Sequence, residues 1–157
     1  MGIATHLGPW LLGTTRYTTG TAAADTRNTG ATQVVQTDVV NFNDADDSNA
    51  FVLPAGSLIT AFRFITTTTF DAATTVTLSI GGTAITAALT VTTAGAYQFT
   101  AAATTAAAAL WANTGTTDKF VTYTVAQGAS TVGAGLLIVE YVVRNSDGTM
   151  YQSAGQV

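Results

Sequence analysis

The chain has 157 residues, of which 47% are hydrophobic and only 9% charged, and its formal net charge is −4. This length suits a single domain with a sizeable core, and the acidic balance with five scattered basic residues argues against a nucleic-acid partner. The lack of cysteine excludes disulfides and thiolate chemistry, and no apolar run approaches the roughly 20 residues of a membrane-spanning helix, so we expect no membrane partner.

Residues 1–30 differ in kind from the rest of the chain, because they are rich in Gly, Thr and Ala. Such a segment cannot form a core alone, so it either packs on the domain that follows, for instance as a first strand over Trp10–Tyr17, or reaches a neighbouring subunit. We therefore divide the chain into an N-terminal arm or first strand, 1–30, and a β-sandwich domain, 31–157. We expect the arm to form an interface through one apolar cluster: Leu7, Trp10, Leu11 and Leu12.

Beyond the arm, short segments of alternating or β-branched residues recur between clusters of Gly, Asn, Asp and Thr, a pattern that predicts strands. Gly81 and Gly82 are a two-residue hairpin signal, since the turns of such hairpins need positive φ. Ala103–Leu110 fits either a short helix or a tightly packed loop. The predicted strands are Thr32–Phe42, Leu58–Thr66, Thr75–Ile80, Thr83–Thr86, Tyr97–Ala102, Lys119–Ala126 and Leu136–Arg144.

Many short strands with regular turns and almost no helix predict an all-β, antiparallel sandwich or barrel. Alternation along each strand then predicts the side chains of the core. Glu140 falls on the other face of the last strand, where Arg63 or Arg144 could pair with it at the surface. The predicted core faces are Leu58, Phe62 and Phe64 with Val76, Leu78 and Ile80, and then Val139, Tyr141 and Val143.

Candidate catalytic residues are sparse. The one histidine, His6, lies in the arm, and no second histidine or cysteine is available for a zinc site or a nucleophile–base pair. No pair of carboxylates has a recognisable spacing, and neither a dinucleotide-binding nor a P-loop pattern is present. We therefore expect no catalytic residue, no cofactor and no enzymatic activity.

One acidic stretch, Asn41–Asn49, resembles the start of a calcium-binding loop. Asp44, Asp46 and Ser48 take its first, third and fifth positions. The glycine that should follow is Asn49, and the bidentate glutamate expected at the twelfth position is Ala55, so the pattern is broken at two demanding places. We expect a solvent-exposed loop without metal, formed by Asp44, Asp46 and Asp47.

Four features of this chain occur together in a known group of proteins. They are Pro54–Ser57 before a hydrophobic strand, the threonine-rich exit Thr66–Thr69, the Gly81-Gly82 hairpin, and the closing strand Ala134–Tyr141. With the opening MGIATHLGPWLLGTT, they resemble the small jelly-roll-like head decoration (capsid cement) proteins of tailed bacteriophages, over most of the chain. This resemblance implies a β-sandwich of jelly-roll type with an extended N-terminal arm, and it implies no catalytic residues.

The resemblance also implies a function. It points to a structural virion protein that decorates and stabilises a capsid by binding the major capsid protein, usually as a homotrimer, on the capsid surface after synthesis in the host cytoplasm. A threonine-rich surface suits that role, because hydroxyls bond across an interface without the cost of burying ions. The alternatives are a tail or fibre component and a glycan-binding adhesin, for which Trp111 near Asn113, or Tyr17, could supply an aromatic platform.

Overall fold

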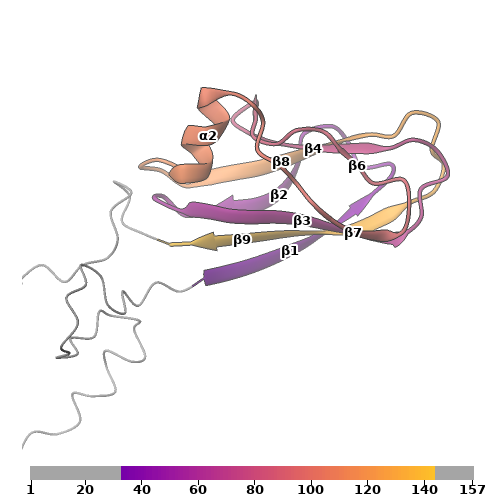
Figure 1. Cartoon of the computed structure of the whole chain (residues 1–157), viewed down its shortest axis with the longest axis horizontal. Helices are drawn as coiled ribbons and strands as arrows, with labels where there is room; N and C mark the ends of the chain where they lie inside the picture. The colour runs from indigo at the N-terminus through magenta and orange to yellow at the C-terminus, as the bar shows by residue number, and fades with distance from the viewer. Residues whose placement is uncertain (1–32, 144–157) are drawn as a thin grey trace, which may run out of the picture.

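The computed structural model describes residues 33–143, which form two antiparallel β-sheets packed face to face (Figure 1). Sheet A has the strand order β1 (Gln33–Asn41), β9 (Ala134–Val142), β3 (Leu58–Thr68), β7 (Gly95–Gln98). Sheet B has the order β2 (Ser48–Leu53), β8 (Lys119–Ala126), β4 (Thr75–Ile80), β5 (Thr83–Ala84), and β6 (Leu89–Thr90) also pairs with β4. The predicted all-β antiparallel sandwich is confirmed.

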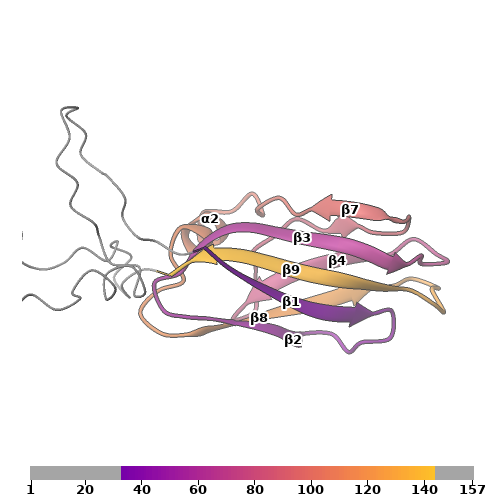
Figure 2. The same cartoon turned by 90° about the horizontal axis from the view of Figure 1, so that it is seen from below.

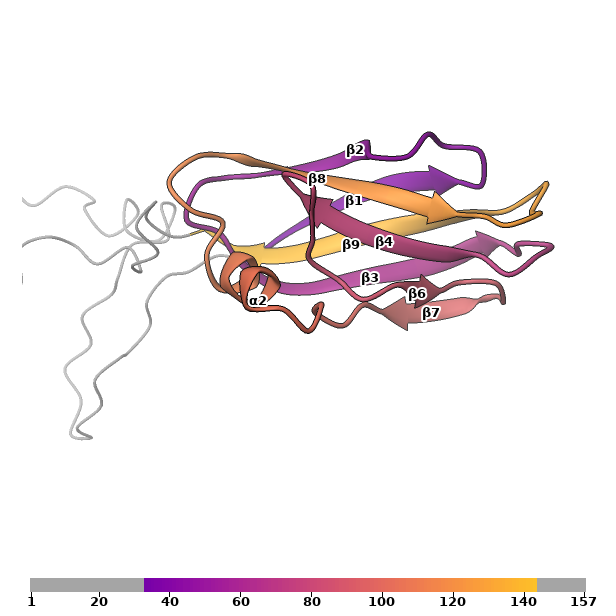
Figure 3. The same ribbon diagram turned by 90° about the horizontal axis from the view of Figure 1, so that it is seen from above.

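Strands that follow one another in the chain mostly lie in opposite sheets. The chain passes from sheet A to sheet B between β1 and β2, returns for β3, and crosses again for β4, and it repeats this alternation through β7, β8 and β9. Figures 2 and 3 show the two layers from below and from above, with β1, β9 and β3 in one and β2, β8 and β4 in the other. This wrapped, double-sheet arrangement is that of a jelly roll.

Most predicted elements are confirmed within a few residues. The helix is present as α2 (Thr105–Ala112), and its first turn is capped by the Thr104 hydroxyl, which accepts a hydrogen bond from the Ala107 amide at 3.1 Å. Gly81 and Gly82 have φ of 56° and 76° and join β4 to β5, as the hairpin signal predicted. The predicted strand Trp10–Tyr17 lies outside the described residues.

Strands β2 and β6 were not predicted, and one predicted strand proved to be divided. Strand β2 was not predicted, because it begins inside the acidic stretch and a register shift between Asn49 and Phe51 interrupts its alternation. The predicted strand Tyr97–Ala102 is divided: residues up to Gln98 pair with β3, and then the chain leaves sheet A, so that Ala101 bridges to Thr86.

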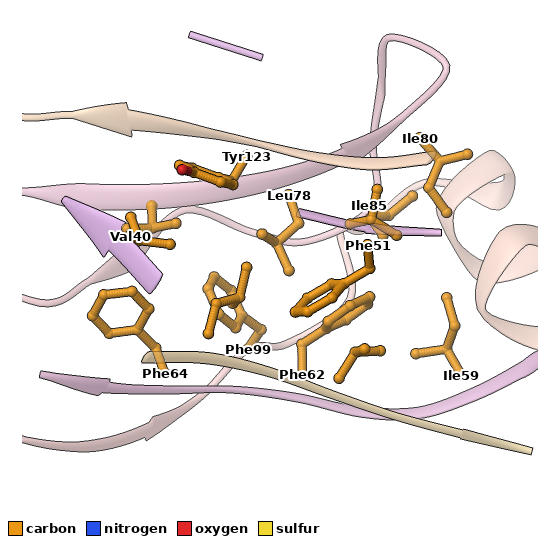
Figure 4. Close-up of a cluster of buried hydrophobic side chains, with 14 of the residues drawn as sticks. Val40, Phe51, Ile59, Phe62, Phe64, Leu78, Ile80, Ile85, Phe99 and Tyr123 are labelled. Atoms are coloured by element: carbon orange, nitrogen blue, oxygen red, sulfur yellow. The ribbon is translucent and has the colours of Figure 1, made fainter. Parts of the chain in front are cut away.

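The core lies between the two sheets and contains side chains from both (Figure 4). Phe62 and Phe64 are fully buried, as predicted, whereas Leu58 is only half-buried and Ile59 takes the core position. The cause is a register shift between Ile59 and Ala61, which reverses the alternation at the start of β3. Their predicted partners are buried too: Val76, Leu78, Ile80, Val139 and Tyr141.

Two glycines let aromatic rings close the core against the last strand. A Cβ on Gly135 would overlap the Phe64 ring and lie 3.0 Å from the Ile65 carbonyl oxygen, and a Cβ on Gly133, where φ is 148°, would overlap the Phe70 ring. Sheet A therefore holds Phe64 in place only because β9 has no side chain at position 135.

We predict that Gly135→Ala lowers the free energy of unfolding by about 1–3 kcal/mol, because the added methyl group overpacks the site between Phe64 and the β3 backbone. Urea unfolding measures this change. Gly95→Ala is the matched control, since Gly95 also lies in a strand of sheet A but its added Cβ meets only the Tyr97 ring at an ordinary 3.4 Å. Equal unfolding midpoints for the two variants would contradict the packing argument.

Candidate functional surface

The outer faces of the two sheets differ in chemistry. On sheet B, most outward positions where β4 and β8 pair carry hydroxyls, with Thr77 opposite Thr124 and Ser79 opposite Thr122. Such a face is polar without being charged, and it follows the usual pattern of an antiparallel sheet that has one buried and one solvated side.

Sheet A departs from that pattern, because a row of aliphatic side chains crosses its outer face. The register places Val39 opposite Leu136, Leu136 opposite Ile65, and Ile65 opposite Ala96, so one apolar row crosses all four strands. Val39 is 58% exposed and Ile65 38% exposed. Two further outward side chains extend this surface toward Glu140: Ile138 on β9, between Thr37 and Arg63, and Val35 on β1, opposite Glu140. We call these five side chains the aliphatic face: Val35, Val39, Ile65, Leu136 and Ile138.

The polar end of the same outer face carries an ion pair. Arg63 lies 3.1 Å from the Glu140 carboxylate, and Gln33 donates a hydrogen bond to that carboxylate at 2.8 Å. The Thr60 hydroxyl donates to the Glu140 carbonyl at 2.9 Å. The predicted pairing of Glu140 with Arg63 is confirmed. Because the Arg63 side chain is 52% exposed, solvent screens the pair, and it orders this end of the face rather than adding much stability.

The β1 edge of sheet A is protected against strand addition. Strand β1 pairs only with β9, and on its inward side it carries Asp38, whose carboxylate accepts a hydrogen bond from the Val39 amide at 2.9 Å. A charged residue that points inward on an edge strand disfavours pairing with another chain. On the β1 side, the surface of sheet A that is available to a partner is therefore its face rather than its edge.

Two loops are tied together beyond the apolar row. Asp71, in the loop between β3 and β4, accepts hydrogen bonds from the Thr131 hydroxyl at 2.6 Å and from the Thr131 amide at 2.8 Å. These bonds, the hydroxyl bond foremost, lower the pKa of Asp71 from 3.8 to about 2. The pair links the loops that lead into β4 and β9.

We predict that Thr131→Val raises the pKa of Asp71 toward 3.8, because the hydrogen bond from the Thr131 hydroxyl contributes most to lowering that pKa. The pKa of Asp71 is lower in the folded state, so its stabilising contribution is present above pH 3.8 and is lost as the pH falls toward 2. An NMR titration of the Asp71 carboxyl carbon measures the shift. Thr131→Ser keeps the hydroxyl and is the control; an unchanged pKa in Thr131→Val would refute the assignment.

The acidic stretch is partly built into the fold. Asp46 and Asp47 are exposed, as predicted, but Asp44 is half-buried and accepts hydrogen bonds from the Asn41 amide at 2.6 Å and the Tyr123 hydroxyl at 2.7 Å. The pKa of Tyr123 is raised, mainly by burial of its side chain and next by its hydrogen bond to Asp44. Asp44 was predicted as a solvated loop residue because its partner Tyr123 lies 79 positions away in the sequence.

Trp111, the candidate glycan platform, contacts residues of its own domain instead of presenting a free ring. Its indole N–H donates to the Ile85 carbonyl at 2.8 Å, and its ring meets Phe62 edge-on at a centroid distance of 5.5 Å. The other sequence-predicted site residues lie outside the described residues: His6, Leu7, Trp10, Leu11, Leu12 and Tyr17. Among residues 33–143, no three His, Cys, Asp or Glu side chains form a group that could hold a metal ion.

One exposed aromatic was not predicted as a surface residue. Phe120 is 57% exposed on the outer face of sheet B, opposite Val52, which is 44% exposed. The strict alternation of β8, in which Val121, Tyr123 and Val125 are buried, could have placed Phe120 outward.

The sequence matches no family model and no curated protein. Among solved structures, the fold is similar to a chain in the acidic stable capsid structure of Helicobacter pylori bacteriophage KHP30, with a TM-score of 0.48 and 16% identity over 71% of this chain and 87% of that chain. In the part of the chain that the structure describes, no helix is long and apolar enough to cross a membrane.

Proposed function

We propose that this protein is a structural component of a bacteriophage virion, which decorates and stabilises the capsid by binding the major capsid protein through the aliphatic face of sheet A. The observation that carries the proposal is the extent of the apolar row: it crosses all four strands of sheet A, whereas the outer face of sheet B carries hydroxyls and one exposed apolar pair, Val52 and Phe120. An exposed, contiguous apolar surface on a small domain marks an interaction site.

The composition supports a role in dense assembly. Only 9% of the residues are charged, so little long-range repulsion keeps copies apart. The sequence resemblance to head decoration proteins supports the location on the capsid surface, synthesis in the host cytoplasm and a homotrimeric state, which the mass of the purified protein in solution would test. The proposed role includes no catalytic step and no cofactor.

A second candidate is a tail or fibre component that binds glycans, and the exposed Phe120 favours it. Aromatic rings beside polar groups are typical of sugar-binding surfaces, and Phe120 is followed two residues later by the outward Thr122. The two proposals use opposite faces of the sandwich, so variants of each face separate them.

We predict that the double variant Val39→Thr/Ile65→Thr loses binding to tail-free phage heads by tenfold or more, because each change replaces an apolar group at a cost of about 1 kcal/mol in the contact. Co-sedimentation with heads from the phage that carries the gene, stripped of this protein, measures the affinity. Threonine suits exposed strand positions, so the fold should remain intact.

The matched control changes the same number of apolar side chains on the other sheet, Val52→Thr/Phe120→Thr. Under the capsid-binding proposal this control binds heads like the unchanged protein. Loss of head binding in the control alone would overturn the role of sheet A. Absence of head binding by the unchanged protein, with glycan binding that the control loses, would establish the second candidate instead.

A further inference from the structure

The aliphatic face is exposed, and nothing among the described residues covers its valines on β1. Val35 and Val39 are 57% and 58% exposed, and both lie on the same side of β1. The chain itself contains a matching apolar group outside the described residues: Leu7, Trp10, Leu11 and Leu12. The rest of residues 1–32 is rich in Gly, Thr and Ala and offers those four side chains no core of their own.

We propose that in the free subunit the segment Leu7–Leu12 docks on the aliphatic face of its own sandwich, across the row Val39, Leu136 and Ile65. This is one of the two locations that the sequence left open for the arm. It does not depend on the proposed function, although binding of a capsid to the same face would require the segment to leave.

The length of the connecting chain favours docking within one molecule. Residue Gln33 begins β1, and Val39 lies six positions further along the same strand, about 20 Å away at roughly 3.4 Å per residue. Residues 13–32 connect Leu12 to Gln33, and a random coil of 20 residues has an r.m.s. end-to-end distance of about 25 Å. A tether whose length matches the distance to its site gives an effective concentration on the order of millimolar, well above that of a neighbouring copy in dilute solution.

Charge also favours the association. The described residues carry two bases, Arg63 and Lys119, against seven acids, a net charge of −5, whereas residues 1–32 carry Arg16 and Arg27 against Asp25, a net charge of +1. Opposite net charges draw the segment toward the sandwich at low ionic strength.

The docked segment lies on the face of the sheet, and it does not extend the sheet. Asp38 occupies the Val39 amide on the free edge of β1, which disfavours an added strand there. The apolar row instead crosses the strands, so a segment with several large side chains can cover it. The outer face of sheet B offers fewer apolar partners, Val52 and Phe120.

The absence of cysteine allows a crosslinking test in the full-length chain. We place one thiol beside the apolar cluster, Gly13→Cys, and one beside the row, Thr37→Cys, an exposed outward position on edge strand β1. Both changes leave the proposed contact residues intact. A short bis-maleimide, whose two rings each add one thiol, is applied to dilute protein, and the products are separated by mass and mapped by peptide sequencing.

We expect a crosslink within one molecule between positions 13 and 37, with a yield that does not change on dilution. The matched control pairs Gly13→Cys with Asn49→Cys, an exposed outward position on edge strand β2 of sheet B, and it should give about tenfold less of the internal product if the segment resides on sheet A. Adding Trp10→Ser to the first pair should lower its yield by a similar factor, because docking loses its largest apolar anchor.

Three results would overturn the proposal. Products that join two molecules in preference to one would assign the segment to a neighbouring copy. Equal internal yields at positions 37 and 49 would show that the segment has no fixed location. A yield unaffected by Trp10→Ser would show that the apolar cluster does not hold it. None of these results requires phage heads, so each leaves the capsid-binding proposal to its own test.

Discussion

The pairing of β9 between β1 and β3 is the contact on which the rest of the structure depends. It is formed by the last described strand of the chain, with a register of nine residue pairs to β1 and a bulged register to β3. Gly135 in this strand leaves the room that the Phe64 ring fills, and Leu137, Val139 and Tyr141 complete the core from sheet A. Without β9, strands β1 and β3 would not be joined. Sheet A therefore forms only when the C-terminal part of the domain is present.

The same strand also creates the surface that we connect to function. Its residues are apolar on both sides over Leu136–Val139, which a strand with one solvated face would not need. Because β9 is central, its outward Leu136 and Ile138 are flanked by β1 on one side and β3 on the other. The exposed aliphatic residues of those strands, Val35 and Val39 on β1 and Ile65 on β3, therefore join them in one surface. An isolated exposed valine needs no explanation, but a row that crosses four strands does.

Hydroxyls make much of the remaining surface polar at low charge. Thr77, Thr122 and Thr124 make the β4–β8 part of sheet B polar without ions. Several of the few carboxylates are engaged within the domain: Asp44 with Tyr123, Asp71 with Thr131 and Glu140 with Arg63. A subunit of this kind can approach copies of itself or another protein closely, since few charges must be desolvated on contact. Its specificity then depends on the shape and position of apolar side chains, and the blocked edge at Asp38 directs contacts to the face.

Local pattern was sufficient for most strands, for the Gly81-Gly82 hairpin and for a core of alternating aromatic and aliphatic residues, because strand periodicity and turn chemistry are properties of neighbouring residues. It was not sufficient for β2, for Ile59 in place of Leu58, or for the division of Tyr97–Ala102, because bulges and sheet crossings are set by partners far away in the chain. The pairing of Asp44 with Tyr123 and the joining of Val39, Leu136 and Ile65 into one row have the same origin. By itself the sequence determined that this protein is a sparsely charged, threonine-rich, all-β domain. The tertiary structure alone decided which of its outward aliphatic residues lie side by side, since strand order and register bring together residues that no local pattern connects.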